Sequence, residues 1–264
     1  MRKYWLVIKD TWDEILTYRL SFIVWRIRTV FQLLTVYFLW LVLIPQGSQL
    51  FGYTQSLMLT YILGTAFLSS VILATRSYEM GENINNGDLS IFLIRPINYF
   101  YYWFARDIGD KAMNISFAVI ELSILVVILK PPLFFQHDMM ILFLTAISIT
   151  FSIIMHFLFG SLLGMIGFWS PDVWAPRFIF FIIINFFAGM LFPIDILPKA
   201  VATFFQFTPF PYLLYFPIKI YLGQLNSSHI YVGILTTILW TILLSVFLKM
   251  VWLRGLRFYT AQGH

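Results

Sequence analysis

The sequence predicts an all-α integral membrane protein, a single transmembrane domain over residues 1–264 that contains six membrane-spanning helices. The chain is 60% hydrophobic and only 11% charged, whereas soluble domains are about 45–50% apolar and about 25% charged. A soluble globule has no means of burying this much apolar surface, but spanning helices of about 20 residues expose it to lipid. The chain contains no cysteine, which excludes disulfides, thiolate metal sites and a cysteine nucleophile.

Six apolar segments are separated by polar or proline-containing stretches. The predicted spans cover residues 21–44, 54–75, 112–129, 139–169, 175–192 and 230–252. The fourth segment is longer than the about 20 residues that one straight crossing needs, so we expect it to tilt or protrude. It contains Gly160, Gly164 and Gly167, and small residues at this spacing allow another helix to approach closely.

Two further segments are predicted to be helical without spanning the membrane. Residues 1–19 combine aromatic and aliphatic positions with charges at helical spacing, which predicts an interfacial helix in the headgroup plane; the alternative is an ordinary soluble N-terminal turn. Residues 193–229 contain several prolines among aromatic side chains. This stretch is too apolar for a solvated loop and too interrupted for a span, so we expect short re-entrant or interfacial helices on the extracytoplasmic side.

Residues 79–98 form a polar loop, EMGENINNGDLSIFLIRPIN, between the second and third spans. Its glycine and asparagine residues favour turns, and the Asp88 carboxylate is expected to cap a short helix. That helix must end near Arg95 because Pro96 follows. The apolar side chains on one face of this helix are Leu89, Phe92 and Leu93. A short amphipathic helix needs a surface on which to dock, and the alternative is a mere connector.

Basic residues indicate the orientation of the chain. Of the 17 Lys and Arg residues, Lys130, Lys199 and Lys219 lie on one side of the six predicted spans, and the remaining 14 lie on the other side. By the positive-inside rule, both termini and the 79–98 loop are cytoplasmic. We expect Arg26 and Arg28, in the first turns of the first span, to snorkel to the headgroups.

Charged residues at the start of the third helix are spaced for local ion pairs. Arg106 with Asp110, and Asp107 with Lys111, stand at i, i+4, so opposite charges can pair along one helix face.

A few polar residues within the spans are candidates for lining a translocation pathway. Glu121 is the one acid deep in a span, and burial favours either its protonation or its pairing. His156 is either a proton relay or a helix-packing donor. Asn114 and Asn185 are either interhelical hydrogen-bond donors or substrate ligands. The four histidines form no metal-binding or catalytic spacing, so neither a metal site nor a catalytic residue is expected.

The phosphate-binding pattern GxxxxGK[ST] is absent, so energy from a nucleotide would have to come from a partner. Taken together, the layout resembles the permease subunits of type 2 ABC exporters, in a bacterial six-span branch. The sharpest likeness is the loop GENINNGDLSIFLIRPIN, which looks like the family's "I..G.l...L..P" segment through Ile84, Gly87, Leu89, Leu93 and Pro96.

The resemblance implies that residues 79–98 carry a coupling helix seated in a cleft of a separate ATPase subunit. The contacting residues would be Glu82, Asn83, Asn86, Gly87, Asp88, Leu89, Phe92, Leu93, Arg95 and Pro96. It also implies two ATPases, a second permease that is identical or paralogous, and ATP and Mg on the ATPase, with no cofactor on this chain. The working unit would export a hydrophobic or amphipathic solute, such as a drug, antibiotic, peptide or lipid, across the inner membrane.

Two alternatives from other classes remain open. One is a proton- or ion-coupled secondary transporter that uses Glu121 and His156 as relays. The other is a membrane scaffold or an intramembrane enzyme, against which the missing catalytic set counts. No basic stripe suggests nucleic acid as a partner, whereas membrane lipids are expected to contact the chain.

Overall fold

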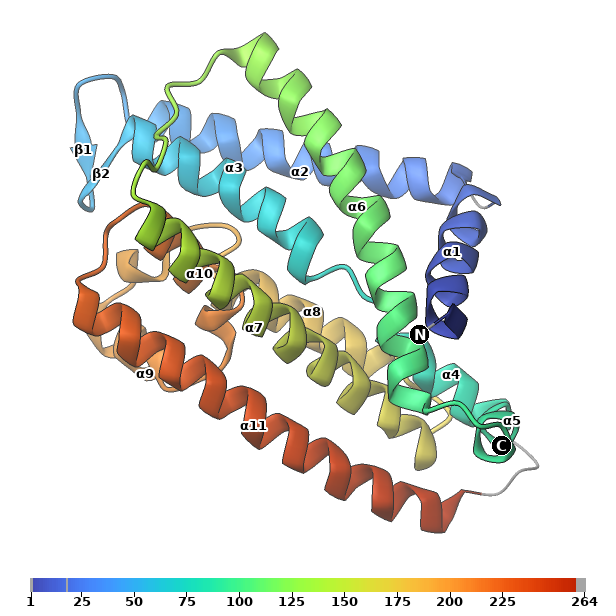
Figure 1. Ribbon diagram of the computed structural model, residues 1–264. Coiled ribbons are helices and arrows are strands. Elements are labelled where there is room, and N and C mark those ends of the chain that lie inside the picture. The colour runs from blue at the N-terminus through green and yellow to red at the C-terminus, as the bar shows by residue number, and fades with distance from the viewer. Residues whose placement is uncertain (1, 18, 260–264) are drawn as a thin grey trace.

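A computed structural model describes residues 2–17 and 19–259. The fold is a bundle of long helices crossed by shorter ones, with a single two-stranded hairpin in its described part (Figure 1). The long helices are α2 (Arg19–Leu43), α3 (Gln55–Ile72), α6 (Tyr99–Leu129), α7 (Met139–Gly164) and α11 (Ser227–Phe258). A 3-10 turn, η2 (Met165–Phe168), continues α7. The chain is an all-α integral membrane protein, as predicted.

Five helices in the described part are long and apolar enough to cross a membrane. They correspond to the predicted spans at 21–44, 54–75, 112–129, 139–169 and 230–252. The predicted span at 175–192 is shorter than expected: α8 (Trp174–Phe187) has 14 residues, about 21 Å at a rise of about 1.5 Å per residue. It ends because the chain turns at Gly189, where φ is +81°, a conformation that glycine adopts readily.

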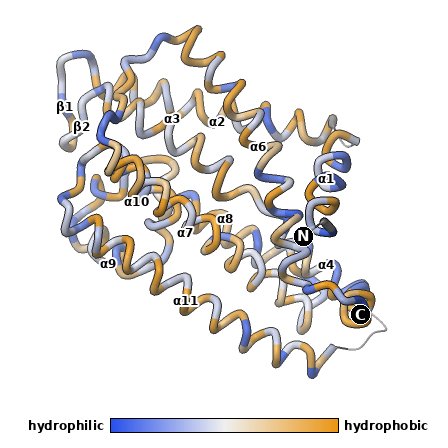
Figure 2. Tube along the Cα trace, in the orientation of Figure 1, coloured by the Kyte–Doolittle hydropathy of each residue, from blue (hydrophilic) through white to orange (hydrophobic). Residues whose placement is uncertain are grey.

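Helix α3 lies at the centre of the bundle. It packs against α2, α6, α7 and α10, and α11 packs along α7 on the far side. Apolar side chains of α3, including Met58, Leu59 and Ile62, are fully or almost fully buried. Hydrophobic residues run along the long helices, whereas hydrophilic residues recur on α1 (Figure 2). Burial therefore distinguishes a protein-facing central helix from outer helices whose apolar faces remain free for lipid.

One end of the bundle, here called the loop end, carries α1 (Arg2–Thr17), η1 (Ser77–Glu79), α4 (Met80–Asn85) and α5 (Leu89–Ile94). Helix α1 packs along α6 and confirms the helix predicted within residues 1–19. Its buried face includes Thr11 and Ile15, while Trp5 and Leu16 are exposed. This two-sided pattern suits a helix at a membrane surface.

The opposite end, here called the hairpin end, carries the antiparallel strands β1 (Gln49–Leu50) and β2 (Tyr53–Thr54), with Gln49 opposite Thr54. It also carries η3 (Ile194–Ile196), α9 (Lys199–Gln206), η4 (Phe210–Tyr212) and α10 (Tyr215–Tyr221). Short helices therefore occupy the proline-rich stretch, as predicted for residues 193–229. Helix α10 packs against α7 and α3, and its residues Phe216–Ile220 are buried. This part of the broken stretch is therefore covered by protein, as an apolar environment requires.

Candidate functional site

Helix α5 lies at the tip of the loop end, between Gly87 and Pro96. Gly87 has φ +80°, and Arg95 is extended, at φ −91° and ψ 147°. The predicted stop before Pro96 is confirmed. Asp88 is the N-cap residue, but its side chain makes no capping hydrogen bond, contrary to the prediction. Its backbone is already helical, at φ −65° and ψ −20°, whereas a capping side chain requires an extended backbone.

The predicted apolar face of α5 is divided between the core and the surface. Leu89 is fully buried within the chain. Phe92 packs on Tyr99 and Tyr102, with ring centroids 5.3 and 4.8 Å away. Leu89 therefore holds α5 against its own chain and is not available to a partner, whereas Phe92 packs on α6 but is only half-buried.

A different apolar surface is exposed at this point. Ile91, Leu93 and Ile94 are 40%, 51% and 85% exposed, respectively, and Arg95 and Pro96 beside them are also exposed. We call Ile91, Leu93, Ile94, Arg95 and Pro96 the α5 tip. An exposed apolar patch of this kind, next to an arginine, is typical of surfaces that contact another protein or a membrane.

Both described ends of the chain contact the segment around α5. Lys3 Nζ donates to the Pro96 carbonyl at 2.8 Å. The Tyr259 hydroxyl donates to the Gly87 carbonyl at 2.6 Å and accepts from the Ser90 amide at 3.0 Å. Tyr259, the residue that follows α11, therefore braces the start of α5, where Asp88 makes no capping bond.

Helix α4, which precedes α5, is tied to α6 and α8. Asn83 accepts a hydrogen bond from Tyr99 on α6 at 3.1 Å. Asn85 donates to the Pro171 carbonyl at 3.0 Å, and exposed Glu82 lies 3.3 Å from Arg177 on α8. Asn86 is also exposed. Of the polar residues expected to contact a partner, Asn83 has an internal role, while Glu82, Asn86, Asp88 and Arg95 remain accessible.

The three glycines of the fourth span lie directly against η1 and α4. A Cβ atom added at Gly164 would be 2.7 Å from Met80 Cβ, and one at Gly167 would be 2.6 Å from the Gly81 carbonyl oxygen. At Gly160 an added Cβ would collide with the Ser77 side chain. These glycines therefore allow η1 and α4 of the polar loop to pack closely on α7 and η2. The prediction that another helix approaches here is met by these short helices and not by a second spanning helix.

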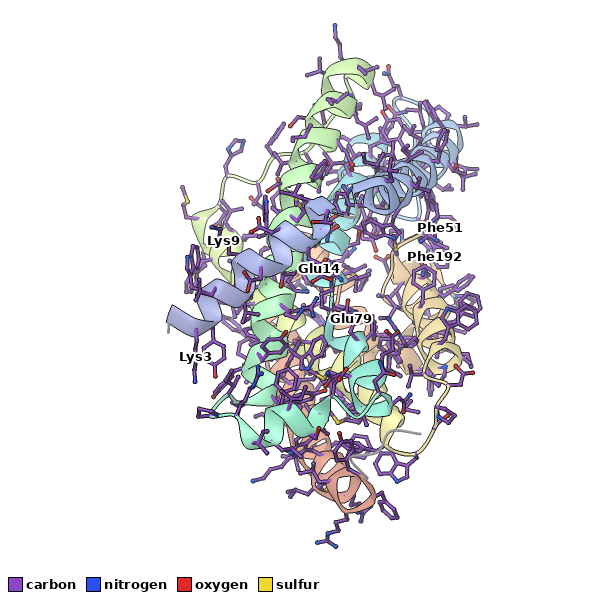
Figure 3. All side chains as sticks on the ribbon, turned by 90° about the vertical axis from the view of Figure 1, so that its right-hand side faces the viewer. Lys3, Lys9, Glu14, Phe51, Glu79 and Phe192 are labelled. Atoms are coloured by element: carbon purple, nitrogen blue, oxygen red, sulfur yellow. The ribbon has the colours of Figure 1, made fainter. Side chains whose placement is uncertain are left out.

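A network of charges joins α1, the η1 turn with its N-cap Arg76, and α6 at the loop end. Arg76 pairs with Glu79 at 2.7 Å, Asp110 at 3.2 Å and Glu14 at 3.6 Å. Burial lowers the pKa of Arg76, but the hydrogen bond and charge of Glu79, with the charges of Asp110 and Glu14, outweigh burial and raise it. Arg106 pairs with Glu14 and Glu79, and Glu14 and Glu79 lie close together in Figure 3.

One of the two predicted helical ion pairs forms. Asp107 and Lys111 pair at 3.1 Å, as expected. The pair of Arg106 with Asp110 is absent from the described residues, because Arg76 binds Asp110 and two acids from other elements bind Arg106.

Glu121 has a partner that the sequence did not reveal. Arg26 on α2 donates from Nε to Glu121 Oε1 on α6 at 2.8 Å, and a second ion-pair contact joins the same side chains. The side chains are only 6% and 22% exposed. Arg26 therefore points inward to an acid rather than outward to headgroups. The pair lines one wall of a cavity of about 380 Å³ between α2 and α6.

The other intramembrane candidates are not assembled into one site. His156 is buried, with its Nε2 3.4 Å from the Tyr78 hydroxyl. Asn114 and Asn185 each donate to a backbone carbonyl one turn earlier on their own helix, at 3.0 and 2.7 Å, so neither makes a hydrogen bond between helices, which is one of the two alternatives for these residues. Glu121 and His156 have separate partners. No cluster of three metal-ligating side chains occurs among the described residues.

Sequence reasoning missed a polar cluster at the hairpin end. Lys219 of α10 is buried and donates to Asp195 at 2.8 Å, to the Tyr53 hydroxyl at 2.9 Å and to Gln224 at 2.7 Å. Burial lowers the pKa of Lys219, and the hydrogen bond and charge of Asp195 partly offset this. The one available signal was that Lys219 and Asp195 are rare charges in an apolar stretch. The cluster, here called the Lys219 latch, joins β2, η3 and α10.

The sequence was compared with models of known protein families. A family model described as "ABC-2 family transporter protein" matches residues 30–263. No curated protein matches the sequence. The matched region contains α3, α6, α7, α11 and the α5 tip, so it includes nearly the whole bundle. The chain therefore belongs to the ABC-2 family of transporter proteins and is a multi-pass membrane permease of an ABC transporter.

Proposed function

We propose that this chain is the permease of an ABC exporter and that ATP hydrolysed on a separate subunit drives it through the α5 tip. The exported solute is hydrophobic or amphipathic. ATP and Mg bind the partner subunit, and the working unit contains two ATPases and a second permease, identical or paralogous. The loop end is cytoplasmic and the hairpin end extracytoplasmic in the cell's inner membrane, in agreement with the 14 to three distribution of Lys and Arg.

The single observation that carries this proposal is the exposed apolar α5 tip at the end of a firmly attached loop. Ile94 is 85% exposed, whereas Leu89, five residues earlier, is completely buried. Exposed apolar side chains next to an arginine are typical of the central contacts of protein interfaces. An ATPase cleft that bound the α5 tip would contact a helix that is held firmly to the rest of the permease.

The contacts that attach the loop to the bundle explain how an ATPase bound at the α5 tip could move the long helices. The α5 segment is bonded to α1 through Lys3 and to the end of α11 through Tyr259. The preceding α4 packs against η2 at the end of α7 and is tied to α8 through Glu82 and Arg177. A displacement of the tip would therefore be transmitted to several long helices as a rigid-body rotation.

The test is a pair of matched exposed substitutions. Ile94→Asp places a charge at the centre of the α5 tip, and we expect at least a roughly tenfold weaker association with the ATPase, as for an interface residue that contributes about 1.4 kcal/mol or more. Phe51→Asp is the control, because Phe51 is 60% exposed at the hairpin end. Co-purification and ATP turnover of the reconstituted complex are measured. Unchanged association and turnover in Ile94→Asp would remove the coupling assignment.

Substitution of Leu89 would not be a clean test of the same idea. Leu89 is fully buried, so an aspartate there would destabilise the loop itself and reduce turnover whether or not the loop contacts an ATPase. Native mass spectrometry of the purified complex measures the number of permeases and ATPases, and a complex with a single copy of either would contradict the proposed stoichiometry.

A further inference from the structure

Arg28 differs from its neighbour Arg26 in having no acidic partner. All 12 Asp and Glu residues lie in the described part of the chain, and none is within ion-pair distance of Arg28. Successive helix positions are about 100° apart, so residues 26 and 28 face nearly opposite sides of α2. Arg26 faces α6 and binds Glu121. Arg28 faces the other way, toward α8.

Arg28 lies within the apolar part of α2. The candidate span begins at Phe22, and six residues at about 1.5 Å each place Arg28 about 9 Å along the helix from that point. A cation inside a spanning helix is costly and is found almost exclusively facing a cavity or a compensating group. Arg28 is exposed on the chain and no carboxylate of the described residues pairs with it, so an anion that compensates its charge would come from outside the chain.

An open, groove-like cavity of about 360 Å³ is located on the surface at this position, between α2 and α8. Arg28 and Gln32 line it from α2, one helical turn apart and on the same face. Phe181, Ile182, Asn185, Phe186 and Leu191 line the opposite side. Small-molecule sites are typically cavities of about 300–1,000 Å³ with mostly apolar walls and a few polar groups, which this composition matches.

The wall formed by α8 is held in place by hydrogen bonds at its end. The Tyr61 hydroxyl donates to the Gly189 carbonyl at 2.6 Å, and Trp40 Nε1 donates to the Leu191 carbonyl at 3.2 Å. The Tyr215 amide donates to the Ala188 carbonyl at 2.9 Å. The turn after α8 is therefore attached to α2, α3 and α10, which fixes the cavity at the hairpin side.

The chemistry of the lining defines the occupant. A guanidinium has five N–H donors and no acceptor, and it suits the planar oxygens of a carboxylate or phosphate. Gln32 and Asn185 add amide groups near it, while Phe181, Ile182 and Phe186 are 47%, 42% and 47% exposed. A ligand that satisfies both parts has an anionic head group and an apolar body.

We propose that the cavity between α2 and α8 binds the transported solute and that this solute is an amphipathic anion whose head group contacts Arg28. This assignment rests on the proposed function. We assign the site to a transported solute rather than to a resident lipid because one cavity wall is connected to the polar loop: the start of α8 is tied to α4 through Arg177 and Glu82. Movement of the loop would displace one cavity wall relative to α2, which suits a molecule that must be released.

Binding is tested on the full chain in nanodiscs of phosphatidylcholine without nucleotide, with empty nanodiscs as the blank. The probe is dansylaminoundecanoic acid, compared with a dansyl probe of the same chain length that ends in a primary amine. We expect the carboxylate probe to bind at least about tenfold more tightly than the amine, and Arg28→Gln to abolish this difference. Arg28→Lys should retain the preference because it keeps the charge. Lys249→Gln is the control, since Lys249 is exposed on α11 outside the cavity.

A second variant protects the test against misfolding of Arg28→Gln. Gln32→Glu is nearly isosteric and places a carboxylate on a half-buried side chain one helical turn from Arg28, where it can pair with the guanidinium, so it must weaken the carboxylate probe at least about tenfold. Equal binding of both probes, or wild-type affinity in Arg28→Gln and Gln32→Glu, would overturn the proposal. So would absence of saturable binding to the wild type, the result expected if a second permease fills the cavity.

Two further results distinguish a transported solute from a bilayer lipid as the bound anion, and distinguish failure of this proposal from failure of the proposed function. Displacement of the probe by a few per cent of phosphatidylglycerol in the nanodisc would show that a bilayer lipid is the occupant, which contradicts the solute assignment. Insensitivity to phosphatidylglycerol supports it. Because binding is measured without an ATPase, failure here leaves the Ile94→Asp result intact, and failure of the ATPase assay leaves the probe affinities intact.

Discussion

Removing Glu121 tests whether the intramembrane acid is a structural partner or a proton relay. Glu121→Leu leaves the Arg26 guanidinium, whose side chain is 6% exposed, without its counter-charge. Arg26 retains a long contact to Ser70 at 3.5 Å, which is too weak to replace an ion pair. The variant therefore carries an uncompensated buried charge.

The expected magnitude follows from burial of the two side chains. Removing one partner of a buried ion pair costs about 3–5 kcal/mol. The 22% exposure of Glu121 and the adjacent cavity give Arg26 some access to water, so we expect the lower end, about 3 kcal/mol. Replacing both residues, as Arg26→Met with Glu121→Leu, removes both charges and should return most of the lost stability, because apolar replacements of buried pairs are often neutral.

Unfolding of the purified chain in mixed micelles by increasing dodecyl sulfate gives the free energies of the two single variants and the double variant. A coupling energy of about 2 kcal/mol or more between the residues is expected for direct partners. Additive losses would refute the pairing argument. Full stability of Glu121→Leu, together with loss of transport that the double variant fails to restore, would instead favour the proton-relay interpretation of Glu121.

Two predictions concern the ends of the bundle. Gly167→Ala forces a Cβ to within 2.6 Å of the Gly81 carbonyl oxygen, so it should lower the free energy of unfolding by about 1–3 kcal/mol in the same assay. The control is Gly64→Ala, whose added Cβ meets only the flexible end of a side chain and should cost less. Equal losses in the two variants would contradict the close-packing argument. Lys219→Met breaks the Lys219 latch and leaves the Tyr53 hydroxyl and the partly exposed Asp195 without this donor. The backbone amides of α10 should then exchange faster with solvent, by an amount equivalent to a loss of about 1–3 kcal/mol in the free energy of opening. Unchanged exchange would show that the latch does not hold α10.

Some features of the candidate site could be predicted because they depend on local chemistry. The start and end of α5 follow from the positive φ at Gly87 and from Pro96, which excludes helical geometry just before it. The pair of Asp107 with Lys111 forms within one turn of helix. The face of α5 that is free for a partner could not be predicted, because the full burial of Leu89 and the packing of Phe92 on α6 arise only in the folded chain.

The sequence by itself determined that this chain is an α-helical membrane protein, where its long helices run and where its polar loop lies, because hydrophobicity, glycine and proline act over a few residues. Only the tertiary structure decided which polar groups are partners. Arg26 and Glu121 are 95 residues apart, and Lys219 and Tyr53 are 166 apart. No local pattern encodes such pairings, since they arise only when packing of the helices brings distant side chains into an environment with little water. The same packing leaves Arg28 beside a cavity and without an acid.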